Sequence, residues 1–188
     1  MRIISGSLKG RKITETCREH KKITTDFLRE AVFNIIGDKI TGAVFLDLFA
    51  GSGLVGLEAL SRGAAFASFI ELDRQRFFSL KKNLEKLLPP DGYSLHYGNS
   101  LKKMGGLKKK YNFVYLDPPY FDNIYSRTFS LLEQKGILCP AAEIIVERHI
   151  KTGINEIPEH FVQTNERRYG QTIMEFFSYC PALAAPAD

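Results

Sequence analysis

The sequence has no apolar stretch long enough to cross a membrane, and its first residues, Met1–Gly6, lack the apolar core of a signal peptide. We therefore expect a cytoplasmic protein without a membrane partner. Cysteine is scarce: Cys17, Cys139 and Cys180 lie far apart and form no C-x-x-C pair. Neither a disulfide framework nor a metal site is expected from such a pattern.

Size and charge indicate a globular chain with a basic surface. The 188 residues are 44% hydrophobic and 25% charged, which is ordinary for one domain with a sizeable core. The formal net charge is +5 at pH 7, which favours an anionic partner such as a nucleic acid, although a solvated basic surface gives the same count. We expect three parts: a basic arm and linker at 1–22, a main domain at 23–180 and a disordered tail at 181–188.

Apolar runs and helical patterns alternate from residue 43 onward. Strands are expected at 44–48, 66–72, 93–97, 113–116 and 143–147, helices at 54–61, 77–87 and 125–133, and a closing pair of strands at 161–167 and 172–179. This order predicts an α/β, Rossmann-like fold: a doubly wound, mostly parallel sheet of order 3-2-1-4-5 that ends in an antiparallel hairpin. Such sheets bind ligands beyond the carboxyl ends of their strands, where strand order reverses.

The N-terminal segment is basic and carries turn residues. Gly6 and Gly10 permit a small β-hairpin between residues 2 and 14. Its cations are Arg2, Lys9, Arg11 and Lys12. They are candidates for contact with nucleic-acid phosphates, and the alternative is a solvated strand edge protected by lysines.

A helix is expected to begin at Thr25-Asp26, where a polar cap precedes an acid in the first turn. Phe27, Ala31 and Ile35 recur at helical spacing on one face, and Arg29 falls on another. The simplest role for this helix is to cover the sheet.

A glycine-rich turn follows the first strand of the alternation. Gly51-Ser52-Gly53-Leu54-Val55-Gly56 matches G-x-G-x-x-G, and Glu71 lies twenty residues past Gly51, at the end of the next strand. Glycines let a backbone approach a ligand, the helix N-terminus favours an anionic group, and the acid can accept from ribose hydroxyls. Taken alone, this pattern fits a nicotinamide cofactor. The residues expected to contact a cofactor here are Ala50, Gly51, Ser52, Gly53, Glu71 and Leu72.

Asp47, just before the glycine turn, favours a different cofactor. A carboxylate at this place would repel a pyrophosphate, but it suits an ammonium or a sulfonium group. S-adenosylmethionine carries both groups, and its ribose hydroxyls are free. After the third strand, Asn99 and Ser100 are placed to reach its adenine ring, while Asn99 could equally cap the short helix that follows.

The tetrapeptide Asp117-Pro118-Pro119-Tyr120 follows a short buried strand. It is either a tight turn or a stiff shelf, since proline fixes φ and donates no N–H. As a shelf, Asp117 and the Pro118 carbonyl would accept the two N–H bonds of an exocyclic base amine, Pro119 would stiffen the loop, and Tyr120 would stack on the base. Strands 1 and 4 are neighbours at the switch point, so this loop should share a crevice with the glycine turn. The predicted step is direct methyl transfer to an unpaired or flipped-out base, with no metal and no covalent intermediate.

Several blocks of the sequence together resemble the bacterial RsmD family, the 16S ribosomal RNA (guanine-966-N2) methyltransferases. These blocks are Thr24-Thr25-Asp26-x-x-Arg29-Glu30-x-x-Phe33-Asn34, Leu46–Gly53, Gly56–Gly63, Glu71-x-Asp73 and Leu116–Tyr120. The resemblance implies a class I methyltransferase fold, S-adenosylmethionine as cofactor, and a guanine N2 in 16S rRNA as target. It further implies a 30S subunit or late assembly intermediate as partner, and it places Arg29 among the RNA contacts.

Three other functions remain open at this level. An N6-adenine methyltransferase of DNA or RNA would use the same shelf, although no recognition domain of any size is appended. A non-catalytic RNA-binding assembly factor would keep the fold, and a nicotinamide oxidoreductase would keep the glycine turn. The residues support the cofactor and the amine chemistry, whereas the base is chosen by the resemblance alone.

Overall fold

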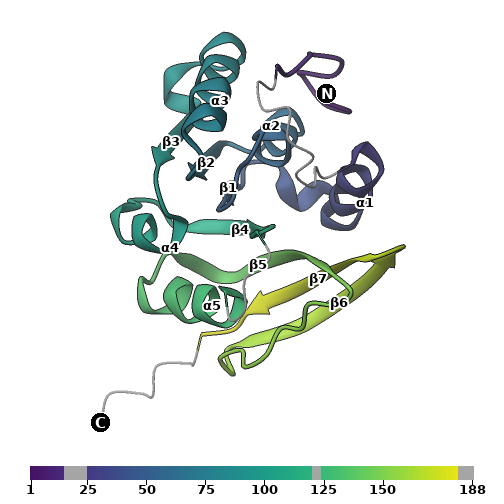
Figure 1. Cartoon of the computed structure of the whole chain (residues 1–188), viewed down its shortest axis with the longest axis vertical. Helices are drawn as coiled ribbons and strands as arrows, with labels where there is room; N and C mark the ends of the chain where they lie inside the picture. The colour runs from purple at the N-terminus through teal and green to yellow at the C-terminus, as the bar shows by residue number, and fades with distance from the viewer. Residues whose placement is uncertain (15–24, 120–123, 182–188) are drawn as a thin grey trace.

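The structure, a computed structural model, describes residues 1–14, 25–119 and 124–181 (Figure 1). Its seven strands form one sheet of order β3-β2-β1-β4-β5-β7-β6. The strands are β1 Val44–Asp47, β2 Phe66–Glu71, β3 Tyr93–Tyr97, β4 Tyr111–Leu116, β5 Leu138–His149, β6 Phe161–Tyr169 and β7 Thr172–Tyr179. The helices are α1 Asp26–Ile36, α2 Leu54–Ser61, α3 Arg74–Leu87, α4 Ser100–Lys103 and α5 Ile124–Gln134, with 3₁₀ turns η1 Gly37–Ile40, η2 Pro90–Gly92 and η3 Met104–Gly106.

The predicted strand order is confirmed. β1 pairs in parallel with both β2 and β4, β3 pairs with β2, and β5 with β4, while β7 pairs antiparallel with β5 and β6. The order therefore reverses between β1 and β4. These two strands are almost wholly buried, as expected for parallel strands that are covered on both faces. No helix in the described part of the chain is long and apolar enough to cross a bilayer.

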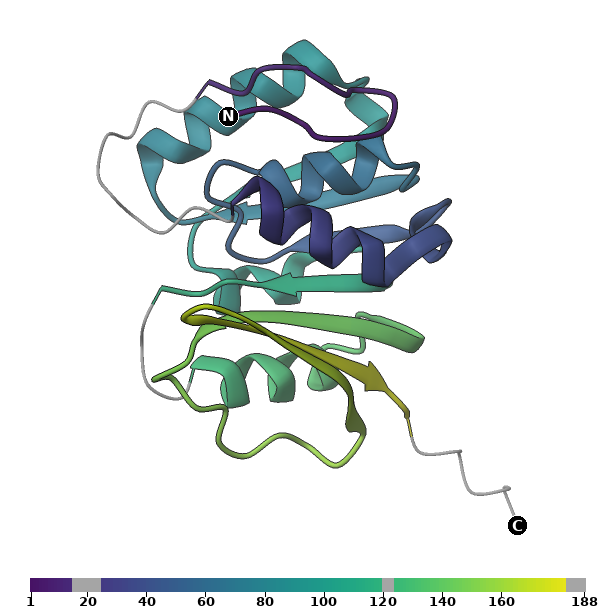
Figure 2. The same cartoon turned by 90° about the vertical axis from the view of Figure 1, so that its right-hand side faces the viewer.

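Helices cover the sheet in two layers, each with its own apolar core (Figures 1 and 2). One core gathers buried residues of α1, α2 and α3 against one face, among them Phe33, Leu57 and Leu80. The other gathers α4, η3 and α5 against the opposite face, with Met104 and Phe129 at 0% exposure. The right-handed crossovers of a doubly wound sheet require this division.

Helix α1 begins where it was expected but buries a different face. Thr25 caps it, since its Oγ1 accepts the N–H of Leu28 at 3.2 Å. The buried residues are Leu28, Arg29, Val32, Phe33 and Ile36, whereas Phe27 is 64% exposed. The helix covers the sheet as expected, but of the face formed by Phe27, Ala31 and Ile35 only Ile35 packs against the core. Two apolar stripes run side by side on α1. The buried stripe contains Leu28, Val32, Phe33 and Ile36, and its larger side chains remove more apolar surface from water.

The N-terminal segment forms a loop that is docked on α2. The expected hairpin is reduced to a single antiparallel bridge between Arg2 and Lys12, although Ile3 and Ile13 belong to the core beneath α2 and α3. The buried Glu58 carboxylate accepts the N–H groups of Ile4 and Ser5 at 2.8 and 3.0 Å. Residues 1–14 therefore pack against the sheet's helical layer, and the division into arm, domain and tail stays a prediction.

Candidate functional site

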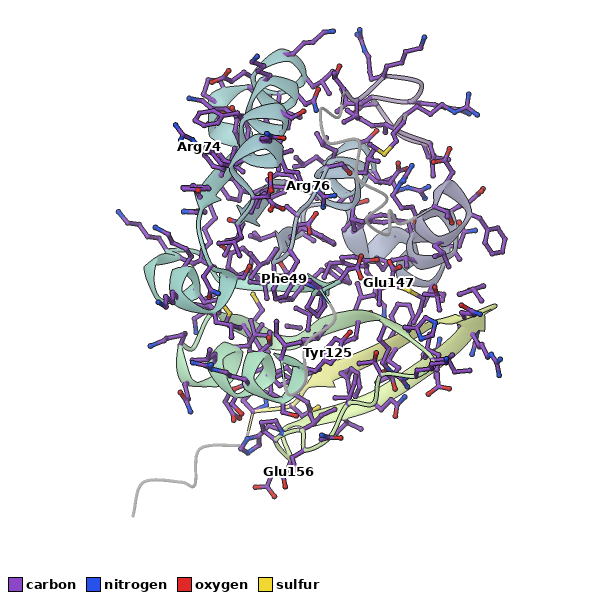
Figure 3. The ribbon with its side chains drawn as sticks, in the orientation of Figure 1. Phe49, Arg74, Arg76, Tyr125, Glu147 and Glu156 are labelled. Carbon is purple, nitrogen blue, oxygen red and sulfur yellow. The ribbon has the colours of Figure 1, made fainter. Side chains whose placement is uncertain are left out.

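The candidate site lies at the carboxyl edge of the parallel strands. β1 ends at Asp47 beside Tyr115 of β4, and the N–H of Leu48 donates to the Tyr115 carbonyl at 3.2 Å. Asp117 is two residues further along the same edge. The loop after β1 and the loop after β4 are thus neighbours where strand order reverses, as the sequence predicted. In Figure 3 Arg76 is labelled above Phe49 and Glu147, which lie at about the same height, and Tyr125 is labelled below them.

Backbone conformation or close packing explains why glycine occupies each of the three glycine positions of the turn. Gly51 and Gly53 have φ of 55° and 74°, a region that favours glycine. A Cβ on Gly53 would also lie 2.3 Å from Cδ1 of Leu80, and a Cβ on Gly56 would lie 2.3 Å from Cε1 of Phe69. The turn is therefore held tightly against α3 and β2.

Glu71 supports the glycine turn directly. One carboxylate oxygen accepts the N–H of Gly51 at 2.6 Å, and the other accepts the N–H of Asp73 at 2.6 Å. Burial raises the pKa of Glu71, and the two N–H donors and the nearby Arg76 guanidinium oppose that rise. A carboxylate has about four acceptor positions, so two backbone bonds leave room for ribose hydroxyls.

Arg76 is a site residue that the sequence reasoning missed. It lies in the first turn of α3, where Asp73 caps the helix by accepting the Arg76 N–H at 2.9 Å. Its Nη1 would be 3.7 Å from a Cβ on Gly51. The sequence signal that could have identified Arg76 is a basic residue in the first turn of the helix that follows the strand-end acid, Glu71. Its charge balances that of Glu71 beside the glycine turn.

Asp47 sits beneath the turn and caps α2. It is 2% exposed, and its Oδ2 accepts the N–H of Gly56 at 3.1 Å. Gly53, at the N-cap position, has no side chain to do this. Burial raises the pKa of Asp47 to about 7, Glu71 adds to the rise, and the Gly56 N–H opposes it. This structural role was not foreseen, and contact of Asp47 with a cofactor ammonium stays a prediction.

The ends of β2 and β3 form an apolar wall next to the turn. Leu72 is 59% exposed and Tyr97 is 48% exposed, and the ring of Tyr97 lies 5.2 Å from that of Phe77. Asn99 caps α4 by accepting the N–H of Lys102 at 3.2 Å, which confirms the capping alternative. Ser100 is buried and donates to the Leu48 carbonyl, so it ties the β3 loop to the end of β1. Adenine contact by Leu72, Asn99 or Ser100 stays a prediction.

The Asp-Pro-Pro loop leaves β4 beside the end of β1, at the carboxyl edge of the sheet. Asp117 is half-buried, Pro118 is buried and Pro119 is exposed, while Tyr120 lies outside the described residues. Burial raises the pKa of Tyr125 above its ordinary range, with the charge of Asp117 as the next cause. Tyr125 donates to the Glu147 carbonyl at 3.4 Å, so it joins the first turn of α5 to the end of β5, within reach of the Asp117 charge.

A comparison with known proteins assigns the chain to a family. The family described as "Conserved hypothetical protein 95" matches residues 1–178. The chain belongs to this family. Two of its relatives, in Escherichia coli (strain K12) and Haemophilus influenzae, are named "Ribosomal RNA small subunit methyltransferase D". The first is 36% identical over 94% of this chain and 89% of the relative, and the second is 37% identical over 78% of each. The expected kinship with the RsmD family is confirmed.

Solved structures extend the family likeness to the fold. The Escherichia coli protein yhhF has a TM-score of 0.86 and 34% identity, covering 96% of this chain and 98% of that one. An RNA methyltransferase from Salinibacter ruber, solved with S-adenosyl-L-homocysteine, has a TM-score of 0.66 at 14% identity, covering 89% and 99%. The second likeness concerns the fold alone. The predicted Rossmann-like methyltransferase fold is confirmed.

The cations predicted to meet RNA fall into two groups in this family member. Arg2, Lys9, Arg11 and Lys12 are all exposed. Arg29 is 1% exposed, and its Nη2 donates to the Arg2 carbonyl at 3.0 Å and to Asp26 at 2.8 Å. It joins the N-terminal loop to α1, so its assignment to the RNA surface is corrected. No group of three His, Cys, Asp or Glu side chains in the described ranges is arranged to hold a metal.

Proposed function

We propose that this protein transfers a methyl group from S-adenosylmethionine to the exocyclic N2 of a guanine in 16S ribosomal RNA. The single observation that carries the proposal is the placement of Asp117 and the glycine turn at one switch point. The names of the relatives in Escherichia coli and Haemophilus influenzae support ribosomal RNA as the substrate.

The residues of the crevice fit this cofactor. The backbone cradle at Gly51–Gly53 admits close approach, the Glu71 carboxylate offers acceptors for ribose hydroxyls, and the Leu72–Tyr97 wall offers an apolar surface for a purine. Ala50, Ser52, Asn99 and Ser100 complete the proposed set. When bound, the cofactor supplies a methyl group made electrophilic by a positively charged sulfur.

Asp117 and Pro118 act on the acceptor amine. The lone pair of guanine N2 is delocalised into the ring, which makes the nitrogen a poor nucleophile. When the Asp117 carboxylate and the Pro118 carbonyl accept its two N–H bonds, the nitrogen pyramidalises and its lone pair turns toward the crevice. The carboxylate also stabilises the positive charge that develops on nitrogen. Pro119 keeps the loop stiff, and Tyr120 would stack on the base.

The base must be unpaired or flipped out to reach such a crevice. We propose the 30S subunit or a late assembly intermediate in the cytoplasm as the partner, with no membrane and no metal involved. Tritiated-methyl transfer to small subunits that lack the modification, to naked 16S RNA and to DNA tests this, followed by nucleoside analysis. We expect label in N2-methylguanosine. Label in N6-methyladenine would reject the guanine assignment, and absence of both transfer and cofactor binding would favour an assembly factor.

A further inference from the structure

A groove runs along the outer side of α1, facing the edge strand β6. Its volume is about 320 Å³, at the lower end of the range for small-molecule sites. The lining residues are Phe27, Glu30, Ala31, Asn34, Ile35, Arg167 and Tyr169. The ring of Phe27 meets that of Tyr169 edge-on, with centroids 5.5 Å apart and planes at 84°.

The groove lies beside a second apolar stripe on α1, formed by Phe27, Ala31 and Ile35. Ile35 packs partly against the core, whereas Phe27 leaves 64% of its surface exposed. On the facing side, Arg167 pairs with the buried Met174 of β7, so both point to the α1 side of the sheet. The exposed Phe27 ring meets the half-buried ring of Tyr169, and an aromatic surface that the core leaves uncovered is a candidate recognition site.

The groove opens at the same edge of the sheet as the candidate crevice. Thr172, where β7 begins, pairs with His149 at the carboxyl end of β5, so Tyr169 at the hairpin tip lies at that edge. The C-terminus of α1 leads through η1 into the start of β1, which places Phe27 in the first turn of α1 at the carboxyl edge. Figure 2 shows the hairpin tip and the beginning of α1 on the same side as the end of β4.

The charges of the groove determine how an RNA strand would enter it. Arg167 is exposed at one wall and attracts a phosphate, whereas the carboxylate of Glu30 repels one. Glu30 and the amide of Asn34 offer acceptors for base N–H groups, and the Phe27 and Tyr169 rings offer stacking surfaces. The base therefore belongs inside the groove and its phosphate at Arg167.

We propose that this groove binds an unpaired nucleobase of the substrate RNA, a nucleotide near the one whose base occupies the Asp117 crevice. The identity of the RNA rests on the proposed function. The groove itself explains how the enzyme selects single-stranded RNA around its target: a paired base has no free face for Phe27 and no free edge for Glu30.

Binding of a fluorescent single-stranded oligoribonucleotide, followed by anisotropy, tests the groove without requiring catalysis. We expect Phe27→Ala to weaken binding about tenfold, within the range for loss of one base–aromatic stack, with no change in the salt slope because no charge is removed. Phe27→Tyr keeps a ring and should retain binding. Val162→Ala, also an exposed apolar side chain (51%) but near the start of β6, is the matched control and should bind like the wild type.

Two neighbouring arginines distinguish RNA binding in the groove from general electrostatic attraction to the basic surface. Arg167 lines it, while Arg168 is exposed, pairs with Ile173 and points to the opposite face of β6. Arg167→Gln should weaken single-strand binding several-fold more than Arg168→Gln, whereas both should affect a duplex of the same strand equally.

Equal effects of the two arginine variants, or unchanged binding in Phe27→Ala, would overturn the groove proposal even if the wild type methylates RNA. A variant that shifts from dimer to monomer in size-exclusion chromatography would assign the groove to a second copy of the chain and would also overturn it. Conversely, wild-type protein that binds single strands through the groove but transfers no methyl group would reject the proposed function and leave the groove in place.

Discussion

The carboxylate of Glu71 accepts the N–H of Gly51 at 2.6 Å, so the end of β2 holds the turn that follows β1. Its second oxygen holds Asp73, which caps α3. One buried side chain therefore aligns both loops that would face the cofactor. A glutamine has only one acceptor oxygen for these two N–H groups.

We expect Glu71→Gln to lower the free energy of unfolding by about 1–3 kcal/mol, because one buried N–H loses its acceptor. Affinity for S-adenosylmethionine should fall roughly tenfold or more, since the turn is no longer aligned and a ribose acceptor is lost. Urea unfolding and calorimetric titration measure the two effects. Glu85→Gln on α3, whose side chain is 54% exposed, is the control and should change neither.

The glycine turn offers a test with an internal reference. Gly53 and Gly42 have the same φ of 74°, but a Cβ on Gly53 would meet Leu80 at 2.3 Å, whereas nothing lies within 4 Å of a Cβ on Gly42. Both alanine variants pay for left-handed backbone. Gly53→Ala should cost about 1–3 kcal/mol more in urea unfolding, because it also overpacks the contact with α3. Equal losses would mean that Leu80 moves aside freely.

Asp117 is expected to act on the acceptor amine alone. Asp117→Ala should reduce kcat about 100-fold or more, the scale for removal of one transition-state contact, while the Kd for S-adenosylmethionine stays within roughly twofold. Single-turnover methyl transfer and calorimetry separate the two quantities. If cofactor affinity fell as much as turnover, Asp117 would belong to the cofactor site. Asp91→Ala, an exposed aspartate in η2, serves as the control.

The buried carboxyl of Asp47 predicts a pH dependence of stability. Folded Asp47 has a pKa of about 7, against an ordinary value of 3.8. Between these pH values the unfolded chain binds fewer protons than the folded chain, so this group makes the free energy of unfolding fall as pH rises and level off above about pH 7. Urea unfolding at pH 5 and pH 8 should show this fall in the wild type and a smaller one in Asp47→Asn. If the free energy of unfolding fell equally in both proteins, a group other than Asp47 would be losing its proton over this pH range.

The cations of the N-terminal loop should differ in their effect on RNA binding. Arg2 lies next to Asp26 at the start of α1, near the carboxyl edge, and Lys12 is its bridge partner. Lys9 lies in the turn that docks near Ser61, where α2 ends at the opposite edge. Arg2→Gln with Lys12→Gln should lower the salt slope of RNA binding by about 0.7 per lost contact, and Lys9→Gln should not. If Lys9→Gln lowered the slope as much as Arg2→Gln with Lys12→Gln, the two ends of the loop would not differ in their contact with RNA.

Local sequence determined the parts of this protein that depend on neighbours in the chain. The glycine spacing, the strand-end positions of Asp47 and Glu71, and the prolines after β4 are readable because turn chemistry and apolar periodicity act over a few residues. The strand order followed from the alternation of strands and helices, since right-handed crossovers leave few topologies. That order also predicted that the loop carrying Asp117 and the glycine turn follow neighbouring strands.

Only the tertiary structure decided which partner each side chain meets. Apolar residues recur at helical spacing in two stripes on α1, so periodicity alone could not decide which stripe faces the sheet. The fold buries the stripe that contains Leu28 and Phe33 and leaves Phe27 in a groove. The sequence predicted that Arg29 contacts RNA and that Asp47 contacts the cofactor. In the structure Arg29 donates to the Arg2 carbonyl, and Asp47 accepts the N–H of Gly56. Such contacts join segments distant in sequence, and the free energy of burying a charge is set by the surroundings that folding assembles around it.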